Sequence, residues 1–251
     1  MKYSYEDALA YFQVPFAHPG GKQLTSELLI NESITTETTI LDAGCGTGST
    51  SYLLSDLYGA RIEAVDKHSE MVQAATRKAS MLTKPFHVSL GNVEKLSFSN
   101  QQFDLILSES VIAFTNVAST LKEFARVLKD KGRLYLIEMT KESSMTSEME
   151  EEMKAFYQLE KLLSEKDWTK ALDTAGFKKV EVLKASTIAE VIAEGVKMGD
   201  DSSHQHIKLL KEDLSQVLID HYQLNLQLSN HLGYRVIRAM KRSSHLIEGK
   251  I

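Results

Sequence analysis

The feature that most limits the fold is a glycine-rich run placed between an apolar segment and a helical pattern. The apolar segment Ile40-Leu41 leads through Asp42 into Gly44–Gly48 (GCGTG), and a helical pattern follows from residue 51. Glycines let the backbone turn sharply and let a ligand approach the main chain closely. The helix behind them offers free N–H groups at its first turn. The run therefore predicts a ligand-binding turn between a strand and a helix.

The same alternation of strand and helix patterns continues along the first half of the chain. Short apolar runs, typical of buried strands, lie at 39–43, 61–66, 86–92, 103–110 and 133–140. Helical patterns lie between them at 51–59, 69–82 and 118–129, the last ended by Asp130-Lys131-Gly132. Five strands joined by helical crossovers indicate an α/β fold with a doubly wound parallel sheet.

The second half is richer in helical patterns. Helices are predicted at 144–163, 167–177, 187–198 and 205–229, and strands at 178–185 and 233–241. The first of these helices carries Met145, Met149 and Met153 on one face, a soft apolar stripe. The polar loop around 198–205 holds His204 and His206 with Asp200 and Asp201. A metal site there is one interpretation and a mobile loop is the other.

Composition excludes several classes of protein. The chain has 29 Lys and Arg against 34 Asp and Glu, a net charge of −5, which disfavours a nucleic-acid partner because phosphate contacts need a dense cationic face. Its single cysteine, Cys45, excludes an intramolecular disulfide and a cysteine-rich zinc site. No apolar signal region begins the sequence, and no apolar stretch approaches the ~18 residues of a membrane span. We expect a cytoplasmic protein that does not enter a membrane.

Three details of the glycine run discriminate among nucleotide ligands. The dinucleotide-binding pattern G-x-G-x-x-G needs a third glycine where this chain has Ser49. Asp42 suits a ligand with an ammonium and a sulfonium group, and it would repel a pyrophosphate. Asp66 ends the next strand, where a carboxylate accepts both ribose hydroxyls. A plain tight turn with two surface aspartates is the alternative interpretation.

Taken together, these motifs resemble the class I S-adenosylmethionine-dependent methyltransferases, above all the ubiquinone/menaquinone-biosynthesis type. ILDAGCGTGS is similar to the first motif of that family, and IEAVDKHSEMVQAA to the second. GNVEKLSFSNQQFDLILSES is similar to the segment at the adenine edge, and RVLKDKGRLYLIE to the helix–turn–fifth-strand unit. Asn92 stands where the family usually has Asp, but its carbonyl oxygen still accepts from the adenine amino group.

The resemblance implies a cofactor site as well as a fold. The cofactor is S-adenosyl-L-methionine, with S-adenosyl-L-homocysteine as product, and Asp66 holds the ribose while Lys67 and Met71 lie near the adenine. The expected cofactor-binding residues are Asp42, Gly44, Cys45, Gly46, Gly48, Asp66, Lys67, Met71, Asn92, Val93 and Ser108.

The resemblance also implies one methyltransferase domain with a Rossmann-like, mostly parallel seven-strand sheet and an antiparallel last strand. We expect the core at 30–142, 167–186 and 231–242. An N-terminal arm (1–29) and helical insertions (143–166 and 187–230) would form a lid that selects the acceptor. A monomer and a homodimer are both compatible with the sequence.

The absence of certain residue types from the sequence limits the classes of acceptor that the enzyme can methylate. Prolines occur only at 15, 19 and 85, so the Pro-Pro motif of amino-directed nucleic-acid methyltransferases does not exist after the fourth strand. Cys45 lies in the glycine run, which excludes a cysteine nucleophile of the cytosine-C5 type and a multi-thiol arsenic site. These absences favour a small-molecule acceptor. Methyl transfer from a sulfonium depends mainly on placement and exclusion of water, so no clear catalytic signature is expected.

Four residues are candidates on the acceptor side. Glu109 follows the fourth strand and would act as a base or orient the acceptor, unless it is a solvated loop carboxylate. His18 would be a base on the lid, or a histidine in a turn. Tyr11 and Phe16 would line the acceptor pocket, pack the arm on the core, or do both.

Two alternatives to a methyltransferase remain open. One is a non-catalytic module that binds S-adenosylmethionine as a sensor or partner protein. The other is a nicotinamide oxidoreductase, against which Ser49 argues.

Overall fold

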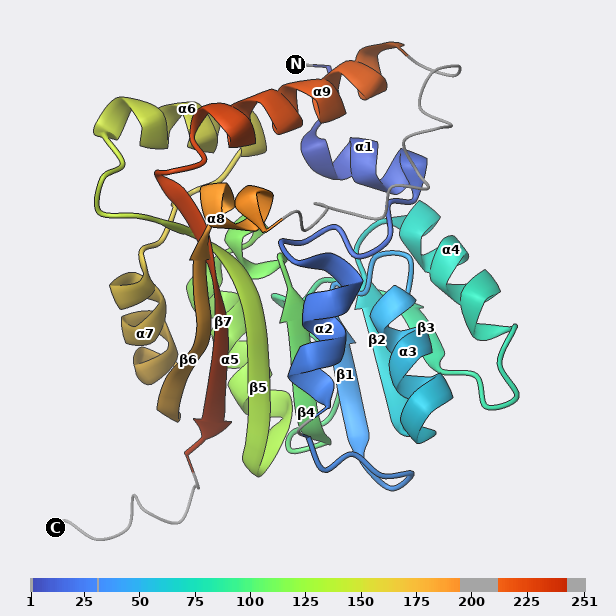
Figure 1. Ribbon diagram of the computed structural model, residues 1–251. Helices are drawn as coiled ribbons and strands as arrows, with labels where there is room; N and C mark the ends of the chain where they lie inside the picture. The colour runs from blue at the N-terminus through green and yellow to red at the C-terminus, as the bar shows by residue number, and fades with distance from the viewer. Residues whose placement is uncertain (1, 31, 195–211, 243–251) are drawn as a thin grey trace, which may run out of the picture.

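The protein forms one twisted sheet covered by helices, as a computed structural model of residues 2–30, 32–194 and 212–242 shows (Figure 1). Within these residues seven strands lie in the order β3-β2-β1-β4-β5-β7-β6. The strands are β1 (Thr39–Ala43), β2 (Arg61–Asp66), β3 (His87–Leu90), β4 (Phe103–Glu109), β5 (Leu128–Lys141), β6 (Phe177–Thr187) and β7 (Leu232–Lys241). The first five pair in parallel, whereas β7 runs antiparallel to both β5 and β6. The predicted mostly parallel sheet with an antiparallel last strand is confirmed.

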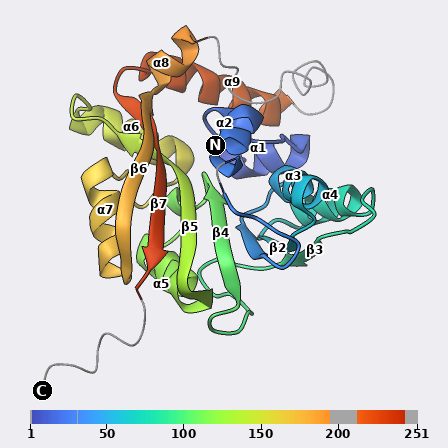
Figure 2. The ribbon, with the colours of Figure 1, turned by 60° about the horizontal axis from the view of Figure 1, so that its bottom comes forward.

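Helices cover both faces of the sheet. The helices are α1 (Tyr5–Phe12), α2 (Gly21–Leu29), α3 (Ser49–Tyr58), α4 (Ser69–Ala79), α5 (Val117–Val127), α6 (Ser147–Tyr157), α7 (Glu165–Thr174), α8 (Ile188–Ala193) and α9 (Glu212–Gln227), with a short 3₁₀ turn η1 (Ile112–Phe114). Helices α2, α3 and α4 lie on one face, and α5 and α7 lie on the other (Figure 2). Apolar side chains of these helices pack against the strands.

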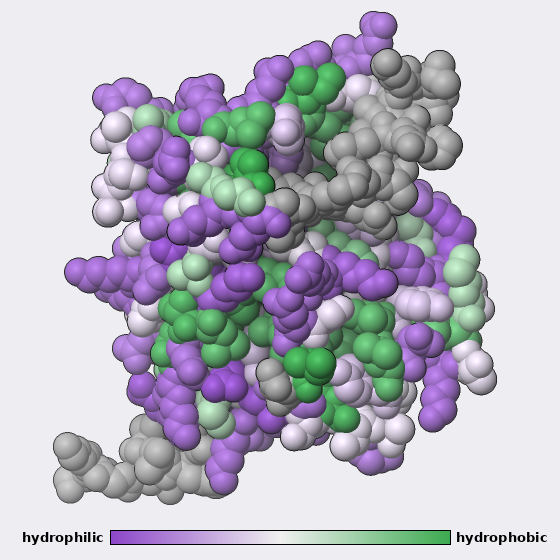
Figure 3. Space-filling view, in the orientation of Figure 1, coloured by the Kyte–Doolittle hydropathy of each residue, from purple (hydrophilic) through white to green (hydrophobic). Residues whose placement is uncertain are grey.

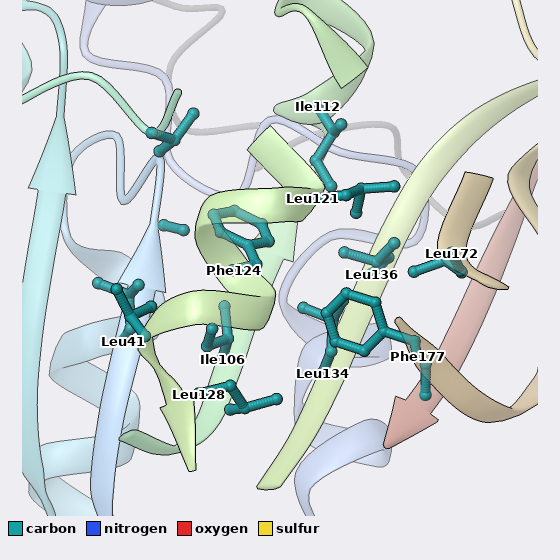
Figure 4. Close-up of a cluster of buried hydrophobic side chains, with 14 of the residues drawn as sticks. Leu41, Ile106, Ile112, Leu121, Phe124, Leu128, Leu134, Leu136, Leu172 and Phe177 are labelled. Atoms are coloured by element: carbon teal, nitrogen blue, oxygen red, sulfur yellow. The ribbon is translucent and has the colours of Figure 1, made fainter. Parts of the chain in front are cut away.

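The central strands are apolar on both sides because both sides are buried. Along β4, Leu105 joins the cluster under α2–α4 while its neighbour Ile106 joins the cluster under α5 and α7. Figure 4 shows this second cluster, in which Phe124 of α5 lies near Ile106 of the sheet and Leu172 of α7 lies near Leu136. This double burial is why strands of the first half read as continuous apolar runs in the sequence.

Four helices, α1, α6, α8 and α9, lie beyond the carboxyl ends of the parallel strands, and we call them the cap (Figure 1). Inside the cap, Met153 of α6 packs with Leu224 of α9, and Met145 and Met149 join the same cluster. The methionine stripe is thus part of the interior of the cap. Hydrophobic side chains also appear on the outer surface of the cap (Figure 3). Among the described helices, none has both the length and the apolar character needed to cross a bilayer.

Several element boundaries differ from the sequence prediction, and two of the differences are large. Helix α5 ends at Val127, and β5 begins at Leu128, which pairs with Phe103 of β4 and is fully buried. The strand was therefore predicted too short. Helix α6 ends at Tyr157, because Gln158 adopts a left-handed conformation (φ 56°). Leu159 and Leu162 still point into the cap from irregular chain, so their helical spacing was misleading.

The parts of the predicted helices at 195–198 and 205–211 lie outside the described residues, as do His204, His206, Asp200 and Asp201.

Candidate functional site

A cavity of about 1160 Å³ lies between the carboxyl ends of the strands and the cap. Residues that follow β1, β2 and β4 line one part of it, together with a segment after β3. Residues of α1, α6, α8 and α9 line another part. Ligands of open α/β sheets bind at this edge, where neighbouring crossovers leave in opposite directions. The fold therefore places the glycine run and the cap around one common space.

The glycine run forms the floor of the cavity. The N–H groups of Gly44 and Cys45 both donate to the carbonyl oxygen of Val65, at 2.8 and 2.9 Å, which fixes the run against β2. Gly46 has φ +51°, and a Cβ built there meets no atom within 4 Å. Since Gly46 also lines the cavity, a side chain at this position would project into the space that a ligand needs.

Asp66 is held in one orientation at the end of β2. One oxygen accepts the N–H of Gly46 and the other accepts the N–H of His68, each at 2.9 Å. A carboxylate oxygen has two lone pairs, so both oxygens retain one for another donor. This arrangement fits the pair of adjacent hydroxyls of a ribose.

Asp42 lines the same cavity, but its carboxyl group is not the fully ionised one that was expected. Its carboxylate accepts the Ser51 hydroxyl at 2.5 Å and is almost fully buried. The pKa of Asp42 is raised to about 7, mainly by burial and also by the nearby charges of Glu109 and Asp66, against the lowering effect of the hydrogen bonds with Ser51. A carboxyl group with this pKa is only partly ionised at neutral pH, which weakens it as a partner for a cation.

Most of the other predicted cofactor residues line the cavity. These cavity-lining residues are Gly44, Cys45, Lys67, Met71, Asn92 and Val93. Lys67 is paired with Glu6 of α1 at 2.8 Å, which ties the end of β2 to the cap. Asn92 uses its carbonyl oxygen to accept the N–H of Glu94 at 2.8 Å and keeps one lone pair. Burial raises the pKa of the Cys45 thiol well above its ordinary value, so the thiol stays protonated.

Three predicted site residues are not among those that line the cavity: Gly48, Ser108 and Tyr11. Gly48 has φ +71°, and a Cβ there would lie 2.8 Å from that of Ala75, so this glycine serves the packing of α3 on α4. Ser108 is fully buried within β4. Tyr11 is 39% exposed and packs edge-on against Phe12 on the outside of α1.

His18 and Glu109, predicted as acceptor-side residues, meet in the cavity wall. The His18 Nε2 atom lies 3.5 Å from Oε1 of Glu109, and their side chains are 3% and 10% exposed. Thr25 of α2 and Thr50 of α3 each donate a hydroxyl to Glu109 at 2.6 Å. The interpretation of Glu109 as a solvated loop carboxylate is therefore wrong. Phe16 also lines the cavity.

Aromatic side chains from four segments of the chain, α1, η1, α6 and α9, line the cap side of the cavity. The ring of Tyr5 stacks on that of His221 with centroids 4.5 Å apart, and Phe114 and Tyr157 pack around them. The Tyr157 hydroxyl accepts from Asn225 at 2.8 Å and donates to Nδ1 of His221 at 2.7 Å. Burial lowers the pKa of His221 to about 4, so its ring is neutral near pH 7.

Sequence reasoning did not assign Tyr5, Phe114, Tyr157 or His221 to the site. Their meeting depends on the packing of α1, α6 and α9, which no local pattern encodes. The high density of aromatic residues before residue 17 was the one sequence feature that could have indicated a role for Tyr5.

A buried carboxylate, Glu138 of β5, supports the segment after β4. It accepts the N–H groups of Val111, Ile112 and Ala113 at 3.2, 2.8 and 3.4 Å. Burial raises the pKa of Glu138 to about 7, although these hydrogen bonds oppose the shift. A glutamate inside the apolar strand RLYLIEMT was the sequence signal for this role.

The family of this chain follows from comparison with known proteins. Residues 34–178 match the family described as "Methyltransferase domain". The chain belongs to this methyltransferase family. The family uses S-adenosylmethionine as its methyl donor, in agreement with the cofactor expected from the sequence. Membership of this family argues against the alternative that the chain is a nicotinamide oxidoreductase.

Individual relatives support the same assignment. The uncharacterized methyltransferase YodH of Bacillus subtilis is 30% identical over 237 residues, which cover 94% of this chain and 99% of that protein. The demethylmenaquinone methyltransferase of Chlorobaculum parvum is 33% identical over 129 residues, covering 51% of this chain and 48% of that enzyme. The chain thus aligns with about half the length of the latter relative.

A solved structure shows the same fold. Phosphoethanolamine N-methyltransferase 2 of Haemonchus contortus, in complex with S-adenosyl-L-methionine, superposes with a TM-score of 0.78 at 17% identity. The similarity covers 97% of this methyltransferase and 58% of the Haemonchus chain.

Proposed function

We propose that this methyltransferase transfers the methyl group of S-adenosylmethionine to a small, uncharged and largely apolar acceptor. The observation that carries the proposal is the shared cavity, which has the glycine run and Asp66 on one side and the aromatic cap on the other. In this arrangement Asp66 holds the ribose, and the segment at Asn92 and Val93 lies beside the adenine. The bound cofactor supplies a methyl group activated by a sulfonium.

The cap supports the assignment of the acceptor. Tyr5, Phe114 and Tyr157 offer flat apolar surfaces, and Ile188 and Leu232 add aliphatic ones. Such walls favour an acceptor that buries its own apolar surface and leaves water outside, which favours methyl transfer. The cavity also supports an enzyme over a non-catalytic binding module, for which no acceptor space beside the cofactor is needed.

The charge of the lining favours an acceptor without an anionic group. Among the described residues, Lys67 is the only lysine or arginine that lines the cavity, and it is already paired with Glu6. Phosphate groups are usually bound by arginine forks or by lysine. We therefore expect neutral aromatic or quinol-like acceptors to be methylated in preference to phosphoesters.

Calorimetry with S-adenosylhomocysteine tests the cofactor site. Asp66→Ala removes both ribose contacts, so we expect affinity to fall by about 10- to 100-fold. Asp173→Ala makes the same change at an exposed carboxylate on α7 and should leave affinity unchanged. Absence of binding by the wild-type protein would refute the proposal.

Transfer of tritiated methyl groups tests the acceptor. A panel would pair each neutral phenol or quinol with its phosphorylated counterpart. We expect label in the neutral member of a pair. Tight cofactor binding without label in any acceptor would favour the sensor alternative, and label only in phosphoesters would refute the charge argument.

Further parts of the prediction belong to this proposal. We propose one methyltransferase domain in which the arm and the helical insertions act as a lid, a cytoplasmic location, and no nucleic-acid or membrane partner. The choice between monomer and homodimer is decided by light scattering coupled to size-exclusion chromatography.

A further inference from the structure

We propose that Glu109 binds the ammonium group of S-adenosylmethionine, and that His18 is a positioning residue that holds Glu109 and links it to the N-terminal arm. This inference rests on the proposed function and assigns a role in cofactor binding to two residues that the sequence suggested as catalytic.

The order of the strands places Glu109 at the correct end of the cofactor. Asp66 ends β2, the glycine run follows β1, and Glu109 ends β4, while β1 lies between β2 and β4 in the sheet. A cofactor whose ribose meets Asp66 and whose chain crosses the glycine run extends toward β4. The methionine part of the molecule, with its ammonium group, then approaches Glu109.

Glu109 is built to accept a further donor. Its Oε1 atom accepts the hydroxyl of Thr25 and faces His18, whereas its Oε2 atom accepts only the hydroxyl of Thr50 among the described residues. Oε2 therefore keeps a free lone pair, and Glu109 lines the cavity. An ammonium group is a donor of matching charge for this position.

His18 supports this carboxylate through contacts on both sides of its ring. Its Nδ1 atom lies 3.1 Å from the carbonyl oxygen of Pro19, which anchors the ring to the N-terminal arm. Its Nε2 atom lies 3.1 Å from Oγ1 of Thr25, whose hydroxyl donates to Glu109, and 3.5 Å from Oε1 of Glu109 itself. The ring therefore holds Thr25 and Glu109 in place from the side of the arm.

Asp42, the carboxylate that the sequence favoured for the ammonium, is less suited to it. The Ser51 hydroxyl donates to its Oδ2 atom at 2.5 Å, and burial without a cationic neighbour raises the pKa of Asp42. Glu109, by contrast, keeps a lone pair of Oε2 for a further donor, and the His18 ring holds its Oε1 atom from 3.5 Å.

Four ligands separate the groups of the cofactor without any need to know the acceptor. S-adenosylhomocysteine carries both the ammonium and the carboxylate, its deaminated analogue only the carboxylate, its decarboxylated analogue only the ammonium, and methylthioadenosine neither. Calorimetry measures the affinity of each ligand for the wild-type protein and for Glu109→Gln. Glutamine keeps the shape and an acceptor oxygen but removes the charge.

We expect Glu109→Gln to weaken binding of the two ligands with an ammonium by about 10- to 100-fold. Binding of the deaminated analogue and of methylthioadenosine should stay unchanged. His18→Gln should weaken the same two ligands by a smaller factor. Glu94→Gln makes the same change at another carboxylate of the lining, and there the ratio of affinities for S-adenosylhomocysteine and its deaminated analogue should not change.

Equal losses for all four ligands in Glu109→Gln would show a purely structural role and overturn the inference. If this variant does not fold, the wild-type protein alone decides: the decarboxylated analogue must bind more tightly than methylthioadenosine, and equal affinities would overturn the inference. Failure of the wild-type protein to bind any of the four would instead refute the proposed function.

Discussion

Glu138 accepts the backbone N–H of Ile112 at 2.8 Å in a region where neither residue is exposed to solvent. Together with the N–H groups of Val111 and Ala113, this contact fixes the segment that follows β4 at the cavity. A carboxyl group in such a place links the shape of the site to pH.

Glu138→Gln should reduce the dependence of stability on pH. Burial raises the pKa of Glu138 from 4.5 to about 7, so the folded state holds this proton more tightly than the unfolded state. The stabilising contribution is fully present below pH 4.5 and is lost as the pH rises through 7. Relative to the wild-type protein, the variant should gain on the order of 2–3 kcal/mol between pH 5 and 8. Urea unfolding at both pH values measures this, and parallel profiles would contradict it.

Two glycines of the same run should respond differently to alanine. Gly48→Ala places a Cβ 2.8 Å from that of Ala75 in a left-handed conformation, and should cost about 2–4 kcal/mol of stability. Gly46→Ala meets open space and should cost only ~1 kcal/mol from its positive φ, yet it should weaken S-adenosylhomocysteine binding at least tenfold. Thermal unfolding and calorimetry separate the two effects. A stable Gly48→Ala protein would contradict the packing role.

Tyr157→Phe should destabilise the cap. The change removes the hydroxyl that joins His221 to Asn225 and leaves buried polar groups without that partner, at a cost of about 1–3 kcal/mol. Tyr222→Phe is the matched control, because Tyr222 is 57% exposed, and it should change stability by less than ~0.5 kcal/mol. Equal stability of both variants in urea would show that the network contributes nothing.

Cofactor binding should protect the N-terminal arm from hydrogen exchange. If Glu109 holds the ammonium and His18 holds Glu109, S-adenosylhomocysteine should slow exchange of amides between residues 5 and 20, whereas methylthioadenosine should not. Exchange measured by mass spectrometry compares the two ligands at saturation. Equal protection by both ligands would show that protection of the arm does not depend on the ammonium group.

The fold was predictable from the sequence because its signals are local. Doubly buried strands such as TILDA and FDLILSE appear as short apolar runs, and Gly59 marks the end of α3. The errors arose where tertiary packing replaced a local rule. Leu128 continues the helical pattern in the sequence, but in the structure it pairs with Phe103 in the sheet. Leu159 has helical spacing in the sequence, but it lies in irregular chain.

The residues that line the cavity around the glycine run were predictable from the sequence, and those of the cap were not. Gly46 and Asp66 are separated by 20 residues, and the strand–turn–helix–strand pattern alone brings them to one edge of the sheet. The contact between Tyr157 and His221 spans 64 residues. It joins two helices, and no sequence motif predicts how these helices are placed relative to each other. Gly48 belongs to the same motif as Gly46, but only the position of Ala75 shows that its role is packing.

The N-terminal arm touches both halves of the cavity, through His18 at the end of β4 and through Tyr5 against His221. In the proposed assignment, a single segment joins the place of the methyl donor to the place of the acceptor. If the donor orders this segment, the expected kinetic consequence is an ordered mechanism, in which the donor enters first and S-adenosylhomocysteine leaves last. Turnover of such an enzyme follows the cellular ratio of donor to spent donor, whatever the acceptor is.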